Sequence, residues 1–186
     1  MKTIFEEQTT DKIELVLNSI EKITIKYIDE EKGNFKEIEE PEIQALEKKC
    51  GLILPKSYRL FLKKFAGNNL KIFDKQSYNI QGIFKAQEVS EELIMLDNFT
   101  LPENSFAFSQ WQGYQFYYFV NSGSENPETF LYIEGGTETS TSPPKIYAYG
   151  SFTNWLIDLA IYNMKIIGKN HGYKVEKGIE ELEELK

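Results

Sequence analysis

The chain contains one cysteine and one histidine, Cys50 and His171, and a Cys–His nucleophile would have to be built from this pair. A cysteine nucleophile needs a neighbouring base, so the two side chains would have to meet in space. His171 lies between Gly168 and Gly172 in a polar run that is typical of a loop after a helix. Cys50 follows an apolar helical stripe, where a free cysteine usually serves as a small buried side chain. We therefore expect neither residue to be catalytic.

Other patterns that carry chemistry are equally weak. A single cysteine excludes an intrachain disulfide and the multi-cysteine zinc motifs. The motif Gly-x-Ser-x-Gly is absent, and Gly135-Gly136 is not followed by the Gly-Lys-Ser/Thr of a phosphate-binding loop. Adjacent carboxylates such as Glu91 and Glu92 lie on a helix face that we expect to be solvated, and a carboxylate pair assembled across space stays an alternative. We expect no metal, no cofactor and no enzymatic activity.

The acidic residues are distributed unevenly along a chain of net charge −8. The segment from Ala86 to Pro144 contains no lysine or arginine, whereas the remaining 127 residues carry all 21 of them and 20 of the 29 acidic residues. The basic residues from Lys56 to Lys64 are interleaved with a helical apolar stripe, which does not favour nucleic-acid binding. The acidic segment is either a solubilising face or a surface complementary to a basic protein. Its nine acids are Glu88, Glu91, Glu92, Asp97, Glu103, Glu125, Glu128, Glu134 and Glu138.

Two polar loops and one hairpin tip are the candidate positions for partner contacts. Residues 122–128 and 135–144 are rich in Gly, Ser, Thr, Asn and Pro, and they are either plain solvated connections or contact loops on a rigid sheet. The hairpin tip around residues 112–113 carries aromatic residues, which dominate binding hot spots, although these could equally belong to the core or to a plain turn. The candidate partner-binding residues are Glu103, Trp111, Gln112, Tyr114, Glu125, Glu128, Glu134 and Glu138.

A helical hairpin at residues 41–66 is the best-defined element of the scaffold that must position these side chains. Pro41 suits a first helical position, and Gly51 suits the left-handed residue that ends the first helix. The second helix opens at Pro55, and its apolar face consists of Tyr58, Phe61, Leu62 and Phe65. Further helices are expected at residues 11–22, 88–97 and 152–167, the last with a buried stripe of Trp155, Leu156, Leu159, Tyr162 and Ile166.

Alternating apolar residues predict strands at residues 23–28, 70–73, 78–84, 105–111, 114–121, 129–134 and 145–149. Gln112-Gly113 has the composition of a two-residue hairpin turn. Helix-period sequence at both ends of a period-two centre predicts a single α+β domain, with a mostly antiparallel sheet of about five or six strands flanked by helices. Residues 173–186 are polar and acidic, and would form a weak docked helix or remain disordered.

An ordered set of motifs resembles the SUKH superfamily (the Smi/Knr-like domain) over about residues 38–167. The motifs are Leu46-Glu47, Gly51, Leu54-Pro55, Tyr58, Phe61-Leu62, Gly67-Asn68, Phe106-Ala107-Phe108-Ser109, Gln112-Gly113-Tyr114, Phe116, Tyr132, Glu134-Gly135 and Ser151-Phe152. The resemblance implies an α+β domain without enzymatic activity, preceded here by an elaboration at residues 1–37 and followed by a tail at residues 168–186. Trp111 departs from the pattern, since many members carry histidine before Gln-Gly.

In bacteria the resemblance implies an immunity protein bound to a toxin, and in fungi a scaffold in cell-wall regulation. We expect the first: a protein that neutralises a cognate toxin with a basic surface, such as a nuclease, with the regulatory scaffold as the alternative. No apolar run approaches the ~20 residues that span a bilayer, and the N-terminus turns acidic before a signal-peptide core could form. We therefore expect a cytoplasmic monomer or weak dimer that binds neither nucleic acid nor membrane.

Overall fold

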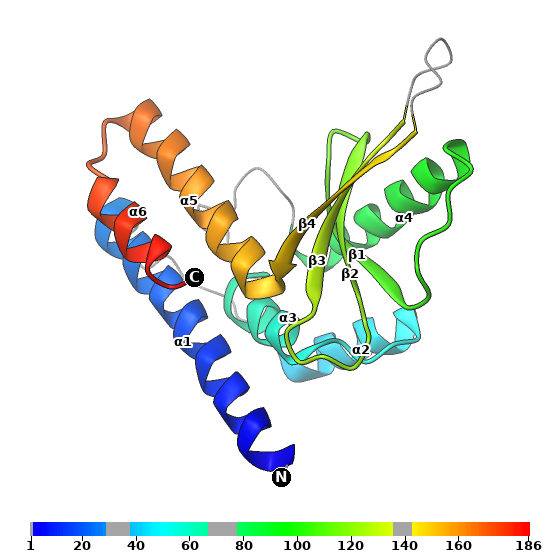
Figure 1. The fold of residues 1–186 in the computed structure, drawn as a ribbon, viewed down its shortest axis with the longest axis horizontal. Coiled ribbons are helices and arrows are strands. Elements are labelled where there is room, and N and C mark those ends of the chain that lie inside the picture. The colour runs from blue at the N-terminus through cyan, green and yellow to red at the C-terminus, as the bar shows by residue number, and fades with distance from the viewer. Residues whose placement is uncertain (1, 29–37, 67–77, 136–142) are drawn as a thin grey trace.

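Four antiparallel strands form a sheet in the computed structural model, which describes residues 2–28, 38–66, 78–135 and 143–186 (Figure 1). The strands are β1 (Ser105–Trp111), β2 (Gln115–Val120), β3 (Glu128–Ile133) and β4 (Lys145–Ser151). They are hydrogen-bonded in chain order, β1-β2-β3-β4, so each strand returns beside the one before it. The predicted α+β class is confirmed, and the predicted number of strands is too high.

Two of the surplus predicted strands are helical. Residues 23–28 belong to α1 (Lys2–Ile28), because Ile20, Ile23, Thr24 and Ile28 line its buried face at helical spacing despite their β-branched side chains. Residues 78–84 open α4 (Ile80–Leu96), where Asn79 caps the helix by accepting a hydrogen bond from Gly82 N at 2.8 Å. The strand predicted at residues 70–73 lies outside the described residues.

The predicted helical hairpin is confirmed. It consists of α2 (Glu40–Cys50) and α3 (Lys56–Phe61), and α3 continues into a wider π-helical turn, η1 (Leu62–Ala66). A reciprocal capping box between Glu39 and Glu42 starts α2, and Gly51 ends it with a φ of +69°. Glu47 braces the corner, since it accepts hydrogen bonds from Leu54 N at 2.8 Å and from the Arg59 guanidinium.

The two faces of the sheet are covered by different helices. On one face, α4 packs against β1 and β2, and Phe116 stacks on Tyr132 with ring centroids 4.7 Å apart. On the other face, α3 and the start of α5 (Phe152–His171) enclose an aromatic core. That core contains Tyr58, Phe61, Phe106, Phe108, Phe119, Phe152 and Trp155. Most of the packed aromatic residues therefore lie between the sheet, α3 and the first turns of α5.

Beyond its first turns, α5 packs against other helices and diverges from the sheet (Figure 1). Its buried side faces α1 and α6 (Glu176–Glu183), and includes Ile157, Ala160, Ile161 and Met164. The predicted stripe was correct for Trp155 but wrong for Tyr162, which is 52% exposed. The apolar surface of α5 is divided between the sheet, which covers its first turns, and α1 and α6, which cover the rest. This division could not be predicted from the sequence alone.

Residues 176–183 form a docked helix, one of the two outcomes expected for this segment. Leu182 of α6 is fully buried. Gly178 of α6 packs closely against Tyr27 of α1, because a Cβ atom at Gly178 would lie 2.6 Å from the Tyr27 ring. Lys26 and Glu181 add an ion pair of 2.7 Å between the same helices. The molecule consequently has two arms, one formed by α1, α5 and α6 and the other by the sheet with α4 (Figure 1).

Candidate functional site

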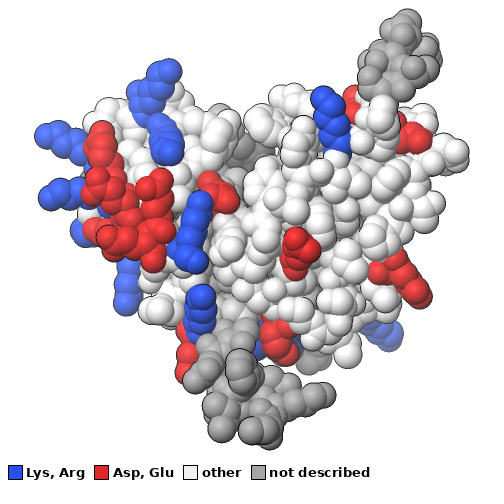
Figure 2. Space-filling view, in the orientation of Figure 1, with Lys and Arg blue, Asp and Glu red and all other residues white. Residues whose placement is uncertain are grey.

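A groove of about 370 Å³ opens between the two arms. It is lined by aromatic residues from both sides and by three further residues of α5. The sheet supplies Trp111, Tyr117 and Tyr149, and α5 supplies Trp155, Asp158, Leu159, Tyr162 and Asn163. In Figure 2 the hollow between the arms is mostly uncharged, whereas charged side chains gather over the arm formed by α1, α5 and α6. This groove is the candidate functional site.

The inner rings of the groove are fixed by neighbouring rings. Tyr117 lies 5.4 Å from Trp155 and 5.8 Å from Tyr149 between ring centroids, and Trp155 packs edge-on against Phe108 at 4.8 Å. Burial and the neighbouring Tyr149 raise the pKa of Tyr117, so its phenol remains neutral at physiological pH. The inner wall is therefore rigid, and the more exposed Tyr162 lies at the rim.

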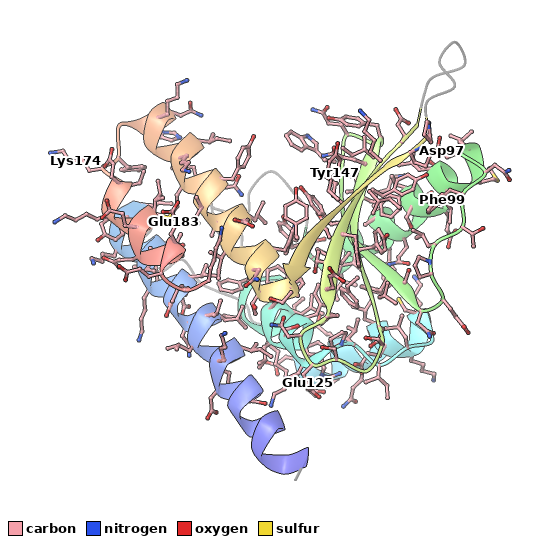
Figure 3. All side chains as sticks on the ribbon, viewed as in Figure 1. Asp97, Phe99, Glu125, Tyr147, Lys174 and Glu183 are labelled. Atoms are coloured by element: carbon pink, nitrogen blue, oxygen red, sulfur yellow. The ribbon has the colours of Figure 1, made fainter. Side chains whose placement is uncertain are left out.

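The strand β4 borders the groove as the last strand of the sheet in strand order. Its residues 145–148 are all exposed, which shows that neither α4 nor α5 covers the strand there. Tyr147 (Figure 3) is 48% exposed and pairs with Leu131, which in turn pairs with Tyr117. These three side chains therefore share the groove side of the sheet. A half-exposed tyrosine beside an aromatic groove extends the apolar surface that a partner could cover.

Of the predicted contact residues, Trp111 lies in this groove and is half-buried. Gln112 is exposed at the hairpin tip, and both Gln112 and Gly113 have positive φ, of 55° and 78°. Trp111 pairs with Gln115, so the loop has three residues rather than the predicted two, and Tyr114 belongs to the loop instead of the strand. Its carbonyl oxygen still accepts a hydrogen bond from Glu134 N at 3.0 Å, which ties the hairpin tip to the end of β3.

The predicted acidic residues lie at two ends of the sheet. Glu103, Glu125 and Glu128 are exposed at the end where β1 begins, and Glu134 is exposed at the opposite end beside the hairpin tip. Glu134 follows Glu128 by six positions, which separates the two ends by about 20 Å along an extended strand. Figure 3 shows Glu125 at the end where β1 begins. Glu138 lies outside the described residues.

One of the nine acids of the acidic segment has an internal role. Asp97 follows α4 and accepts hydrogen bonds from Tyr132 Oη at 2.6 Å and Gly135 N at 3.0 Å. Desolvation and this carboxylate together raise the pKa of Tyr132, which therefore remains a neutral donor. Among the described residues, Glu103, Glu125, Glu128 and Glu134 form no ion pair, so their charges are available to a partner.

Cys50 and His171 do not resemble a catalytic pair. Cys50 is half-buried at the end of α2, where desolvation raises the pKa of its thiol, the opposite of what an activated nucleophile requires. His171 is exposed in the last turn of α5, which extends beyond the predicted loop boundary. The described residues contain no group of three or more His, Cys, Asp or Glu side chains arranged to hold a metal ion. None of the described helices is both long and apolar enough to cross a membrane.

We expect Cys50→Ala and His171→Ala to leave partner binding intact. The cysteine variant should lose about 1 kcal/mol of unfolding free energy, because it removes a half-buried side chain, and the exposed histidine should cost less. Isothermal titration with the partner and chemical denaturation measure the two effects. Loss of partner binding in either variant would instead indicate that the residue contacts the partner, and an enzymatic activity that either variant loses would indicate a catalytic role.

Sequence reasoning missed most of the groove. Tyr117 and Tyr149 were placed only within predicted strands, and Tyr162 in the predicted buried stripe of a helix. The available signal was the interruption of the α5 stripe by Asp158 and Asn163, which place polar atoms beside the apolar positions on the sheet side of the helix. Only the divergence of α5 from the sheet, which the structure shows, turns these positions into a cavity wall.

Comparison with known protein families identifies the family of this chain. A family model described as SMI1-KNR4 cell-wall matches residues 40–156, which is more than half of the chain and extends from α2 to the first turn of α5. No curated protein matches the chain, and no solved structure does. The matched region contains the sheet and its hairpin, while the division of the chain at residues 37 and 167 stays a prediction.

Proposed function

The chain belongs to the SMI1-KNR4 cell-wall family of the SUKH superfamily, and we propose that it is a non-enzymatic immunity protein that binds and neutralises a cognate bacterial toxin. The single observation that carries the proposal is the rigid aromatic groove beside the exposed residues of β4. Such a role places the protein in the cytoplasm of the cell that it protects. A regulatory scaffold of the Smi/Knr cell-wall type is the alternative, favoured by the description of the matching family.

The groove has the composition of a protein-binding surface. Tryptophan and tyrosine are enriched at hot spots because each supplies a large apolar contact area and a polar atom at low entropic cost. Five of its eight lining residues are tryptophan or tyrosine. The lining includes one carboxylate, Asp158, and neither histidine nor cysteine. This combination supports binding by burial of aromatic surface more than it supports acid–base chemistry.

The charge of the chain favours a basic partner. The whole chain has a net charge of −8, and four of its carboxylates are exposed at the ends of the sheet: Glu103, Glu125, Glu128 and Glu134. A toxin that grips phosphate groups must be basic where it does so, and an acidic inhibitor both reaches that surface faster and holds it better. The separation of the acids at two ends of the sheet indicates general steering, with Glu134 alone near the Trp111 end of the groove.

We predict salt-dependent association of this chain with its cognate toxin domain. Raising the salt concentration from about 50 mM to about 500 mM should slow kon by an order of magnitude or more, with a smaller effect on koff, since salt screens long-range attraction. Surface plasmon resonance measures both rates. If a complex forms with a kon that does not depend on salt, the acidic residues do not accelerate association. Absence of any complex would contradict the proposed function.

A matched pair of charge reversals separates contact from steering. Glu134→Lys lies near the groove, whereas the double variant Glu125→Lys and Glu128→Lys lies at the far end of the sheet. We expect the first to affect koff as well as kon and the second to affect mainly kon. The opposite pattern would move the interface to the far end of the sheet, next to α3, whose Ser57 N donates to Glu125 O.

A further inference from the structure

We propose that the toxin adds an extended segment to the open edge of β4 and inserts an arginine or lysine side chain of that segment into the aromatic groove. This inference rests on the proposed function for the identity of the partner, but the recognition chemistry follows from the structure. Two features carry it: the direction of the backbone hydrogen-bonding groups of β4, and the combination of aromatic rings with a carboxylate in the groove.

The open edge follows from the hydrogen-bond pattern of the sheet. In an antiparallel sheet, successive residues of an inner strand bond alternately to its two neighbours. Glu134 N donates to Tyr114 O at 3.0 Å across the β2–β3 pair, so Leu131 and Ile133 of β3 must bond to β4. Their partners there are Tyr147 and Lys145.

The backbone groups of the two residues that flank Tyr147 consequently point outward. The N–H and C=O groups of Ile146 and Ala148 point away from β3, and no described strand pairs with them. Both residues are exposed, Ile146 to 42% of its surface. An edge with free donors and acceptors and exposed side chains on both faces is the template that strand addition uses.

The groove is suited to a cation. The faces of tyrosine and tryptophan rings carry negative electrostatic potential, and a guanidinium or ammonium group over them is attracted more strongly when it is partly desolvated. Asp158 adds a full negative charge to the same lining, and it already forms an ion pair of 2.5 Å with Lys186 in which both side chains are about two-fifths exposed. A partner cation can therefore join Asp158 or displace Lys186 from it.

The two features are in register with each other. Tyr147 pairs with Leu131 and lies on the groove side of the sheet, and Tyr149, two residues along β4, lines the groove itself. A residue directly opposite Tyr147 or Tyr149 on an added strand would project toward the same side of the sheet. Side chains at alternate positions of the added segment would then reach the groove. The bound segment therefore needs both an extended backbone and a basic residue.

A fluorescence titration tests the cation directly, because both tryptophans of the chain, Trp111 and Trp155, line the groove. The probe is the peptide acetyl-Thr-Arg-Val-Arg-Val-Arg-Thr-amide, added up to about 1 mM, the range of weak peptide binding. We expect a saturable change in tryptophan emission. The matched peptide with glutamate in place of arginine should give none. No saturable change with the arginine peptide, or equal binding of the glutamate peptide, would overturn the proposal.

Two variants separate the edge from the groove. Ile146→Pro removes one outward N–H without breaking a bond to β3, and its side chain pairs with Tyr132 on the α4 side, away from the groove. It should bind the arginine peptide about tenfold more weakly than the control Ile146→Val, as expected for one lost hydrogen bond. Asp158→Asn should weaken binding of the arginine peptide several-fold while leaving the fold unperturbed. This variant still tests the proposal if Ile146→Pro misfolds.

The outcomes also distinguish this inference from the proposed function. If the toxin domain binds the wild-type chain and Ile146→Pro equally well, and the peptide has no effect, strand addition is wrong and the immunity role stands. If the arginine peptide binds as expected and the toxin domain does not, the immunity role is wrong and the recognition chemistry stands. A concentration-dependent dimer that Ile146→Pro abolishes would show that a second copy occupies the edge, which would overturn the proposal.

Discussion

Tyr58→Ala should lower the free energy of unfolding by about 3–5 kcal/mol, the range for removing a large aromatic side chain from a core. Tyr58 is 1% exposed and lies at the junction of α3, the sheet and α5. Four rings surround it at centroid distances of 5.4 to 5.7 Å, those of Phe106, Phe108, Phe119 and Phe152. No single neighbour can fill the space that the side chain leaves, so a cavity would persist at the centre of the domain.

Chemical denaturation followed by far-UV circular dichroism measures this effect. Tyr58→Phe keeps the ring and should cost much less, and Tyr162→Ala removes a tyrosine that is 52% exposed and should change stability by less than about 1 kcal/mol. A Tyr58→Ala variant as stable as Tyr162→Ala would show that the aromatic core between α3 and the sheet is not packed as described.

The double variant Trp111→Ala and Tyr162→Ala should weaken toxin binding by two orders of magnitude or more. Each side chain lines the groove, and each hot-spot aromatic residue contributes roughly 2 kcal/mol or more on truncation, although the two effects need not add. Removal of both would also widen the groove and lose the aromatic faces that hold a cation. Isothermal titration calorimetry with the toxin domain measures the change.

The matched control lies on the other side of the molecule. Met95 and Leu96 at the end of α4 are 74% and 75% exposed, so Met95→Ala with Leu96→Ala removes comparable exposed apolar surface away from the groove. We expect this control to bind the toxin with wild-type affinity. If instead the α4 variant loses binding and the groove variant keeps it, the interface lies on the α4 face and the groove has another role.

Much of the scaffold could be predicted from the sequence because local signals agreed there with the tertiary fold. The strand at residues 105–111 has the bounds of β1, and Gly51 ends α2 as its φ preference required. The errors arose where local and tertiary signals disagreed. Ile23 and Ile28 favour a strand by their β-branched side chains, but their spacing matches the helix face that packs on α5 and α6.

The candidate site was less predictable than the scaffold. Trp111 was identified as a candidate contact from its place at a hairpin tip, and the structure brings it together with Tyr117 and Tyr162, which no local pattern connects. The groove exists because α5 packs against α1 and α6 instead of the sheet, and α1 is separated from α5 by more than a hundred residues in the sequence. Glu103, Glu125, Glu128 and Glu134 are exposed, and they are divided between the two ends of the sheet because the extended strand β3 separates Glu128 from Glu134.

The growth of bacteria that express the cognate toxin domain tests the central claim most directly. Co-expression of the wild-type chain should restore growth, co-expression of the Trp111→Ala and Tyr162→Ala variant at the same soluble level should not, and the Met95→Ala and Leu96→Ala control should restore it fully. Failure of the wild-type chain to restore growth would contradict the immunity role, and full protection by the groove variant would contradict the groove as the surface that neutralises the toxin.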